Sequence, residues 1–146
     1  MLRGNAIAKL DGKGRVKIPA LFRPLMESEL GPDFFITSLR GDSVRLYPMT
    51  VWKELEARLS RSSALKPEVM KFRNWTNYFG QNATMDAQGR VLIHPLVREK
   101  AEISGECAVL GQGNFLEIWN HDRFRALLDD QPLTDTDLAV LADIGI

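Results

Sequence analysis

The chain contains the same nine-residue pattern twice. Residues 10–18 read LDGKGRVKI and residues 85–93 read MDAQGRVLI, so that Asp, Gly, Arg, Val and Ile recur 75 positions apart. The similarity continues downstream at an offset of 72, where residues 46–48 (LYP) match residues 118–120 (IWN). A unit of roughly 50 residues therefore occurs twice, and the second copy is shorter by about three residues. This repetition predicts a pseudo-symmetric fold, in which any site built on the repeated segment exists twice.

Alternating apolar residues flank the repeated motif. In the first copy, Ala6, Ala8 and Leu10 precede the turn at every second position, and Val16 and Ile18 follow it with the same spacing. A period of two is typical of a β-strand with one buried face, and glycine between two such segments favours a tight turn. We therefore predict that each copy of the motif joins two strands in a hairpin.

The rest of each copy predicts an α+β, mainly β fold. A second pair of strands is expected in each copy, over residues 34–39, 44–47, 107–110 and 115–119. A short helix is expected over 20–26. Further helices are expected to begin where a proline or a capping residue precedes apolar residues at helical spacing. These start positions are Thr50, Pro67, Pro95, Asn120 and Thr134. The expected order is a first repeat (5–51), a helical connector (52–79), a second repeat (80–123), and a C-terminal helix with an acidic tail (124–146). Because such short repeats bury little surface alone, we expect them to share one core.

The repeated motif, D-x-x-G-R, has a chemistry of its own. An aspartate at a turn accepts hydrogen bonds from backbone N–H groups two or three residues further on, and glycine allows the positive φ that such a turn requires. The turn-forming residues are Asp11, Gly14, Asp86 and Gly89. The arginine that follows, Arg15 or Arg90, is then held on a rigid turn. Its guanidinium can bind a phosphate, or the O6/N7 edge of guanine, through two hydrogen bonds.

Two interpretations of the motif remain open on these grounds. In one, the arginine binds an anion outside the protein. In the other, Arg15 pairs with Asp11 and only holds the turn in place. Neighbouring Lys13, Lys17 and Arg3 favour anion binding by the first copy. The second copy has no lysine at the positions that match Lys13 and Lys17, and we expect it to be the more structural of the two.

The charge of the chain is unevenly distributed. Its formal net charge is zero, with 19 basic and 19 acidic residues. Residues 1–25 nevertheless carry six Lys or Arg and a single Asp, whereas residues 129–146 carry five Asp and no basic residue. In one interpretation, the charges of the basic N-terminal segment and the acidic C-terminal segment cancel in the net charge but leave one strongly positive surface. In the other, both segments are only solvated faces of an ordinary globular protein. Charge alone does not separate these two interpretations.

The sequence offers little for catalysis or for a bound cofactor. Two aspartates in pseudo-symmetric loops resemble the paired carboxylates of aspartic proteases, but the arginine four positions after each would lower its pKa and keep it ionised. The D-T-G signature, nucleophile triads and phosphate-binding glycine loops are absent. His94, His121 and the single Cys107 lack the spacing of metal ligands. We therefore expect no enzyme, no cofactor, no metal site and no small-molecule substrate.

The sequence also predicts a cytoplasmic protein without a membrane partner. No apolar run approaches the roughly 20 residues that span a bilayer, and the first residues do not form a signal peptide. A single cysteine excludes an internal disulfide and fits a reducing compartment.

Taken in order, these motifs resemble those of the MraZ family, bacterial transcriptional regulators encoded at the head of the division and cell-wall gene cluster. The resemblance rests on residues 1–4 (MLRG), 10–19 (LDGKGRVKIP), 46–48 (LYP) with Trp52, 86–93 (DAQGRVLI) and 116–119 (LEIW). It covers residues 1–128 and includes both motif copies in order. His94 stands where the first copy has Pro19, which is a mild departure.

The resemblance implies two AbrB-type swapped-hairpin repeats, packed as a pseudo-symmetric double-split β-barrel with flanking helices. It also implies a ring-shaped homo-oligomer that binds double-stranded DNA at direct repeats in its own promoter. We expect a nucleoid-associated repressor. Arg15 and Arg90 match the arginine of the family's DNA-binding motif, and Lys13 lies within the first copy; Arg3 and Lys17 are added on charge alone.

Two other hypotheses compete with this one. The first is a structural ring that binds other proteins, in which the Arg–Asp pairs only hold the turns. The second is an antitoxin-like AbrB protein. Two motifs in one chain disfavour the second hypothesis, because proteins of that kind usually carry one unit per chain.

Overall fold

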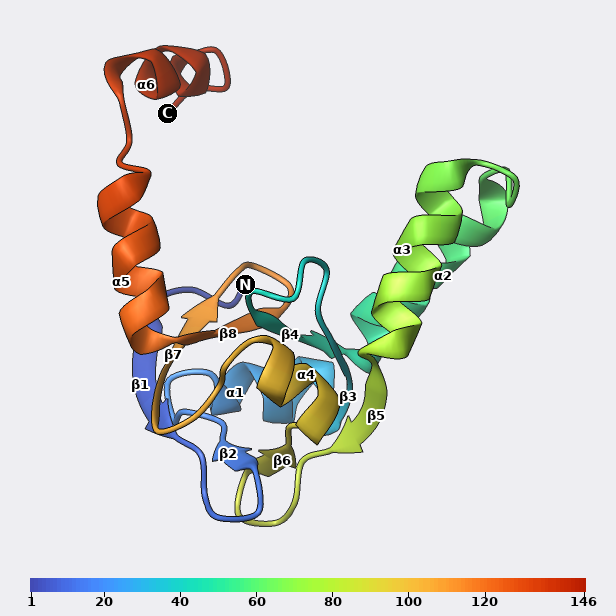
Figure 1. Cartoon of the computed structure of the whole chain (residues 1–146), viewed down its shortest axis with the longest axis vertical. Coiled ribbons are helices and arrows are strands. Elements are labelled where there is room, and N and C mark those ends of the chain that lie inside the picture. Colours follow the sequence, from blue (N-terminus) through green and yellow to red (C-terminus); the bar gives the residue numbers. More distant parts are fainter.

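In a computed structural model, residues 1–146 form eight strands, six α-helices and one short π-helix. The strands are β1 (Asn5–Lys9), β2 (Arg15–Lys17), β3 (Asp33–Thr37), β4 (Val44–Pro48), β5 (Gln81–Thr84), β6 (Arg90–Leu92), β7 (Glu106–Gly111) and β8 (Leu116–Asn120). The helices are α1 (Arg23–Leu25), the π-helix η1 (Met26–Leu30), α2 (Met49–Arg61), α3 (Pro67–Tyr78), α4 (Pro95–Lys100), α5 (His121–Asp130) and α6 (Asp135–Ala142). None of the helices is both long and apolar enough to cross a bilayer. The predicted α+β class, built around β-strands, is confirmed (Figure 1).

All strand pairs are antiparallel, and they form two sheets. Six strands form one sheet in the order β1-β7-β8-β4-β3-β5, and β2 and β6 form a separate two-stranded ribbon. The six-stranded sheet does not close into a barrel, since its edge strands β1 and β5 pair only on their inner sides. Instead, the chain leaves each edge strand through a motif loop and enters the ribbon, which lies below the sheet in Figure 1. The result is an open sheet with a ribbon across one side.

The two repeats exchange strands. β1 of the first repeat pairs with β7 of the second, and β5 of the second repeat pairs with β3 of the first. The local hairpins predicted for both motifs are therefore wrong. β5 does not pair with β6, and β1 and β2 meet only at a single bridge between Leu10 and Val16. Alternation identifies the buried face of a strand but not its partner. Pairing β2 with β6 places Val16 opposite Val91, so that both repeats contribute to one core.

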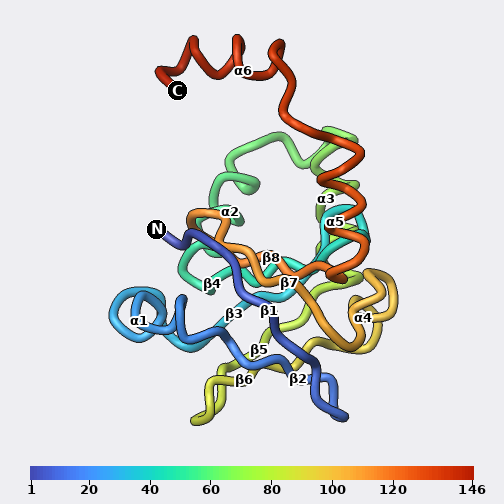
Figure 2. The backbone as a smooth tube through the Cα atoms, turned by 90° about the vertical axis from the view of Figure 1, so that its left-hand side faces the viewer, coloured from blue at the N-terminus to red at the C-terminus, as the bar shows by residue number.

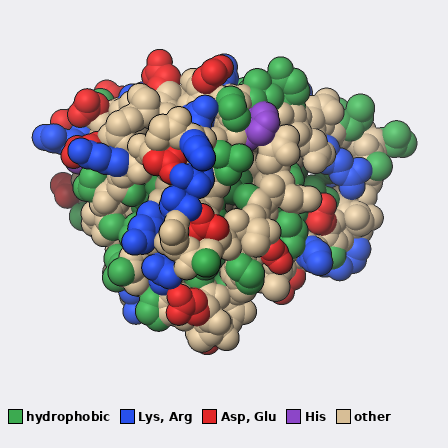
Figure 3. All heavy atoms as spheres, turned by 90° about the horizontal axis from the view of Figure 1, so that it is seen from below, with side chains coloured by type: hydrophobic (Ala, Val, Ile, Leu, Met, Phe, Trp, Pro, Cys, Tyr) green, Lys and Arg blue, Asp and Glu red, His purple; other side chains and the backbone are tan.

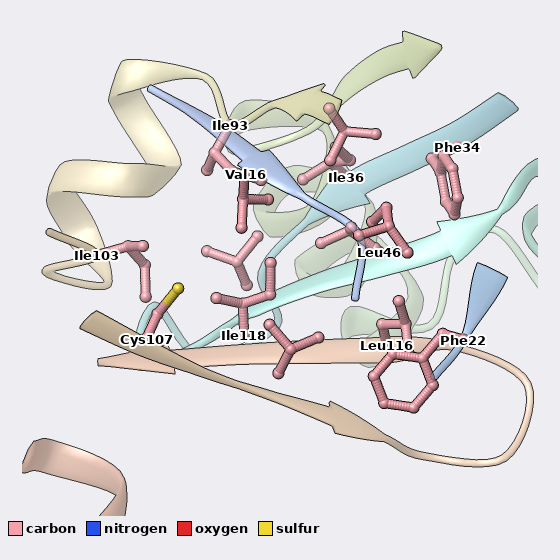
Figure 4. Close-up of a cluster of buried hydrophobic side chains, with 14 of the residues drawn as sticks. Val16, Phe22, Phe34, Ile36, Leu46, Ile93, Ile103, Cys107, Leu116 and Ile118 are labelled. Carbon is pink, nitrogen blue, oxygen red and sulfur yellow. The ribbon is translucent and has the colours of Figure 1, made fainter. Parts of the chain in front are cut away.

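The hydrophobic core is shared by the two repeats, as expected. One cluster of 18 buried residues lies between the six-stranded sheet and the ribbon. Corresponding residues of the two repeats, such as Ile18 and Ile93, both belong to this cluster. In Figure 4, Val16 and Ile93 point from the ribbon side toward Ile118 of β8. The core therefore holds the ribbon, and with it both motif loops, in a defined position.

A second, aromatic cluster anchors α2 to the sheet. Trp52 of α2 is buried and stacks on Phe35 of β3, with ring centroids 4.5 Å apart, and it also contacts Tyr47 of β4 and Phe72 of α3. α2 and α3 form a helical hairpin that projects from the first repeat, and α5 projects from the second (Figure 1). The two projections begin at corresponding positions of the two repeats, because Trp52 of α2 and Phe124 of α5 lie 72 positions apart.

Four of the predicted helix starts are confirmed. Pro67 begins α3 and Pro95 begins α4, as predicted. Asn120 caps α5 by accepting a hydrogen bond from the backbone N–H of Arg123 at 3.1 Å. Thr134 and Asp137 form a capping box at the start of α6. These caps depend on contacts within three residues, which is why the sequence predicts them well.

Two other predicted helix starts are wrong. α2 begins before Thr50, which makes no capping hydrogen bond, because Pro48 ends β4 and takes the cap position itself. The helix expected over 20–26 begins instead at Arg23 and continues as the π-helix η1. Pro24 suits the first turn of a helix, and this favours the later start.

Candidate nucleic-acid interface

Each copy of the motif forms a turn held by its aspartate. In the first copy, Oδ1 of Asp11 accepts hydrogen bonds from the backbone N–H groups of Lys13 and Arg15, both at 2.9 Å. Oδ2 accepts a hydrogen bond from Nε of Arg15 at 2.7 Å. Gly14 has a φ of 80°, a conformation that glycine adopts without strain. The predicted turn forms, although the N–H groups that bind the aspartate lie two and four residues further on rather than two or three.

The second copy repeats this geometry. Asp86 accepts hydrogen bonds from the backbone N–H groups of Gln88 and Arg90 at 2.9 Å, and from Nε of Arg90 at 2.8 Å. Gly89 has a φ of 77°. Since Gln88 replaces Lys13 without altering the turn, its shape depends only on the Asp, the Gly and the Arg.

These hydrogen bonds keep both aspartates ionised. The backbone N–H of Arg15 is the main cause that lowers the pKa of Asp11 from its ordinary value of 3.8 to about 2, and the Arg15 side chain adds to it. The backbone N–H of Arg90 likewise lowers the pKa of Asp86. A general acid or base works best with a pKa near the working pH. The two carboxylates are therefore poorly suited to proton transfer at neutral pH.

The motif arginines keep free donors. Arg15 and Arg90 use Nε to pair with their aspartates, and no terminal Nη atom of either hydrogen-bonds to another group of the protein. Their side chains are 29% and 31% exposed. The two interpretations of the motif therefore describe one geometry: Nε holds the turn, while Nη1 and Nη2 remain able to donate to an anion.

The β2–β6 ribbon carries basic residues on its outer face. The central valine pair is buried, so the flanking pairs, Arg15 opposite Leu92 and Lys17 opposite Arg90, lie on the other face. Like charges directly opposite one another destabilise an antiparallel pair. An anion bound beside Lys17 and Arg90 would remove this repulsion, and the outer face of the ribbon is therefore suited to phosphate.

Two further arginines lie over the motif glycines, and each comes from the opposite repeat. A Cβ atom on Gly89 would lie 3.0 Å from Cζ of Arg23, and one on Gly14 would overlap the guanidinium of Arg98. Nε of Arg23 is buried and has no hydrogen-bond partner, and Nη2 lies 3.6 Å from Oε1 of Glu27. Neither arginine is predicted from the sequence. The sequence feature that could have identified them is their spacing, since Arg23 and Arg98 lie 75 positions apart, as the two motif copies do.

Backbone hydrogen bonds tie each loop to the other repeat. The N–H of Ile18 donates to the carbonyl of Gly89 at 2.7 Å, and the N–H of Ile93 donates to the carbonyl of Gly14 at 2.9 Å. Each motif loop is thus fixed by its own aspartate, by an arginine of the other repeat and by a backbone bond to the other repeat. A loop held in this way loses little conformational entropy when it binds a ligand.

The structure brings four of the five predicted binding residues to one end of the molecule. Arg15, Arg90, Lys13 and Lys17 lie in the motif loops and the ribbon, whereas Arg3 lies beside the β7–β8 turn at the other end of β1. Both loops project from the same end, away from α3 and α5 (Figures 1 and 2). Figure 3 shows this end face-on, with Lys and Arg side chains gathered in a band across it.

His94 and Cys107 have structural roles. No group of three or more His, Cys, Asp or Glu side chains is placed to hold a metal ion. His94 accepts a hydrogen bond from the backbone N–H of Leu96 at the start of α4. Cys107 is buried in the core, and burial raises the pKa of its thiol to about 11. The motif loops therefore present arginine and lysine donors without a nucleophile or a metal-ligand set.

Comparison with known proteins identifies the family. The family described as "MraZ protein, putative antitoxin-like" matches residues 80–139. Proteins named Transcriptional regulator MraZ are similar over the whole chain. That of Acidobacterium capsulatum is 38% identical over 146 residues and that of Koribacter versatilis 42% over 147, covering 100% of both chains in each case. That of Shigella sonnei is 30% identical over 144 residues and covers 95% of each chain. With this identity over its full length, the chain belongs to the MraZ family.

Proposed function

We propose that this protein is a DNA-binding transcriptional regulator that represses its own promoter, in the division and cell-wall gene cluster. It binds double-stranded DNA at direct repeats as a ring-shaped homo-oligomer of AbrB-type repeats, in the cytoplasm and in association with the nucleoid. The name of its relatives, Transcriptional regulator MraZ, supports the regulatory role. The observation that carries DNA binding is the pair of rigid, arginine-bearing loops on one end of the molecule (Figure 1).

The ribbon and its loops suit the DNA major groove. This groove admits a two-stranded β-ribbon, and arginine binds guanine there through two N–H donors to O6 and N7. Arg15 and Arg90 offer their two terminal nitrogens for such a contact, because Nε is already used within the turn. Lys13 and Lys17 are exposed beside them and contact phosphates.

Oligomerisation supplies the affinity that one subunit lacks. The chain has no net charge, and each phosphate contact contributes only about 0.9 to the slope of log K against log salt. Linking several weak sites raises the overall affinity by about 10²–10⁴ when their spacing matches that of the target. The spacing of the DNA repeats therefore sets much of the specificity, with few base contacts per subunit.

The competing function is a structural or protein-binding ring. The observation that favours it is that both motif arginines already pair with an aspartate of their own turn. In that case the terminal nitrogens would face only water. A variant that changes the charge of the outer face of the ribbon and keeps all four residues of the two Asp–Arg pairs separates the two functions.

Lys17→Glu is such a variant, because Lys17 is exposed and belongs to neither Asp–Arg pair, although it lies opposite Arg90 in the ribbon. We would titrate the purified protein on the DNA upstream of its own gene in a gel-shift assay, at several salt concentrations. Arg15→Glu tests the motif directly, and Arg40→Glu is the matched control, since it makes the same charge change on an exposed residue of the β3–β4 turn. Wild type and Arg40→Glu are expected to bind DNA with more than one repeat tightly and in a salt-dependent manner, and DNA with a single repeat only weakly.

Loss of binding in Lys17→Glu and Arg15→Glu, with unchanged oligomeric mass, supports the regulator. Wild-type binding no tighter than to random DNA of the same length would support the structural ring instead. Equal affinity for one repeat and for several would overturn the role given to multivalency.

A further inference from the structure

Helix α6 is exposed although its residues are apolar. From Leu138 to Ala142 the helix carries only Leu, Ala and Val, so apolar side chains point in every direction around its axis. A helix that is apolar all round is normally buried. Yet all of α6 is exposed except Leu141, which is half-buried, and Figure 2 shows the helix standing clear of the body. An isolated helix of eight residues is also too short to be stable in water by itself.

The outer face of α3 is the other apolar surface without a cover. Val69 and Thr76 of α3 are buried, and the opposite side of the helix carries Met70 (53% exposed), Trp75 (39%) and Tyr78 (65%). The C-terminal half of α3 lines a hollow of about 710 Å³, to which Trp75 and Tyr78 contribute. This face of α3 is therefore an exposed apolar surface that nothing in the same subunit covers.

The two surfaces have opposite charge. The α2–α3 helical hairpin, residues 49–79, carries six Lys or Arg and three Glu. The segment that contains α6, residues 129–146, carries five Asp and no basic residue. Asp135 and Asp137 lie in the first turn of α6, and Lys71 and Arg73 lie on α3 among its exposed aromatic residues. Apolar contact and charge attraction therefore favour the same pairing.

The two surfaces lie on opposite sides of one subunit. The helical hairpin packs on β3 and β4, whereas α5, which leads to α6, packs on β7 and β8. In Figure 1 the two projections stand well apart. A contact between different patches on opposite sides is head-to-tail, and repeated contacts of this kind close into a ring or continue as a filament.

We propose that α6 of one subunit docks on the outer face of α3 in a second copy of the chain, and that this contact links neighbouring subunits. The proposal builds on the proposed ring and assigns its interface. In the first repeat, α3 packs beside α2, whereas in the second repeat the apolar helix α6 does not pack on α5. Docking on a neighbouring subunit would give α6 the partner that it lacks within its own subunit. The acidic tail is then a subunit connector.

Two double variants remove the two docking surfaces one at a time: the tail helix α6, and its acceptor surface on α3. Leu138→Asp with Leu141→Asp removes the apolar surface of the tail, and Met70→Asp with Tyr78→Asp removes that of α3. The four side chains are exposed or half-buried, so these changes leave the core intact. Leu21→Asp is the matched control, because Leu21 is an apolar residue that is 58% exposed and lies outside both surfaces. The molar mass is measured by size-exclusion chromatography with light scattering.

Wild type and Leu21→Asp are expected to form oligomers of more than two subunits, and each double variant to be a monomer of 16.5 kDa. An equal mixture of the two double variants is expected to form a dimer and no larger species, because only one intact tail and one intact acceptor remain. A tail variant that keeps the wild-type mass would overturn the proposal, as would a mixture that stays monomeric. Both outcomes leave the ring itself standing.

A monomeric wild type would overturn the ring as well as this interface. DNA binding is then tested apart from assembly, on a probe with a single repeat. Weak binding that is equal in wild type and in the two double variants would show that the motif loops act independently of the interface.

Discussion

The guanidinium of Arg98 lies directly over Gly14, which belongs to the motif of the other repeat. Arg23 takes the matching place over Gly89. Each motif turn is thus closed on one side by its own Asp–Arg pair and on the other by an arginine of the opposite repeat. The strand exchange therefore places a residue of each repeat against the loop of the other, and we expect a change in one repeat to affect the loop of the other.

Gly14→Ala is expected to destabilise the protein by about 1–3 kcal/mol, because a side chain there would adopt a positive φ and would also displace Arg98. Gly12→Ala, in the same loop, is the matched control. Gly12 has neither a positive φ nor a neighbour within 4 Å, and a change within about 0.5 kcal/mol is expected. Urea unfolding followed by circular dichroism measures both free energies. Equal losses in the two variants would contradict the arrangement of Arg98 over Gly14.

Asp11 is expected to make folding stability depend on pH in the acid range. Its pKa is about 2 in the folded protein and 3.8 ordinarily, so the folded state favours the ionised form. This contribution is complete above pH 3.8 and is lost as the pH falls through about 2. Asp11→Asn is expected to show a shallower fall of stability with pH in this window than wild type. Parallel curves for the two proteins, measured by urea unfolding at each pH, would contradict the prediction.

The salt dependence of DNA binding is expected to separate Lys17 from Arg3. Replacing Lys17 by Gln removes one phosphate contact of the outer ribbon face, so the slope of log K against log salt is expected to fall by about 0.9. Arg3→Gln is expected to leave the slope unchanged, because Arg3 lies at the end of β1 remote from the motif loops. Fluorescence anisotropy on labelled promoter DNA measures both slopes. A reduced slope in Arg3→Gln would extend the interface beyond the ribbon.

Trp52→Ala is expected to cost about 3–5 kcal/mol of stability, since the indole is 5% exposed and stacks between β3 and α3. Phe124→Ala, at the matching position of the second repeat, is expected to cost less because Phe124 is only half-buried against Trp119. Thermal unfolding of the two variants tests this difference. A larger loss in Phe124→Ala would place the main anchor in the second repeat.

The sequence alone determined the motif turns. The hydrogen bonds that form the first turn connect Asp11 with residues no more than four positions away, and the second turn is built in the same way from Asp86. Such contacts form wherever the same residues recur at the same spacing, so the repeat predicts two equal turns. The cap at Asn120 and the capping box at Thr134 are predicted for the same reason.

Only the tertiary structure decided which strands pair and what surrounds the loops. Alternation shows that Val16 and Val91 are buried, but it does not show that they face each other across the two repeats. That choice depends on the volume of a core which both repeats must fill together, and no local pattern records it. The same exchange carries Arg23 and Arg98 onto the opposite loops and leaves Arg3 at the far end of β1. Contacts within a few residues follow from the sequence, whereas contacts across the exchange depend on the burial of the whole chain.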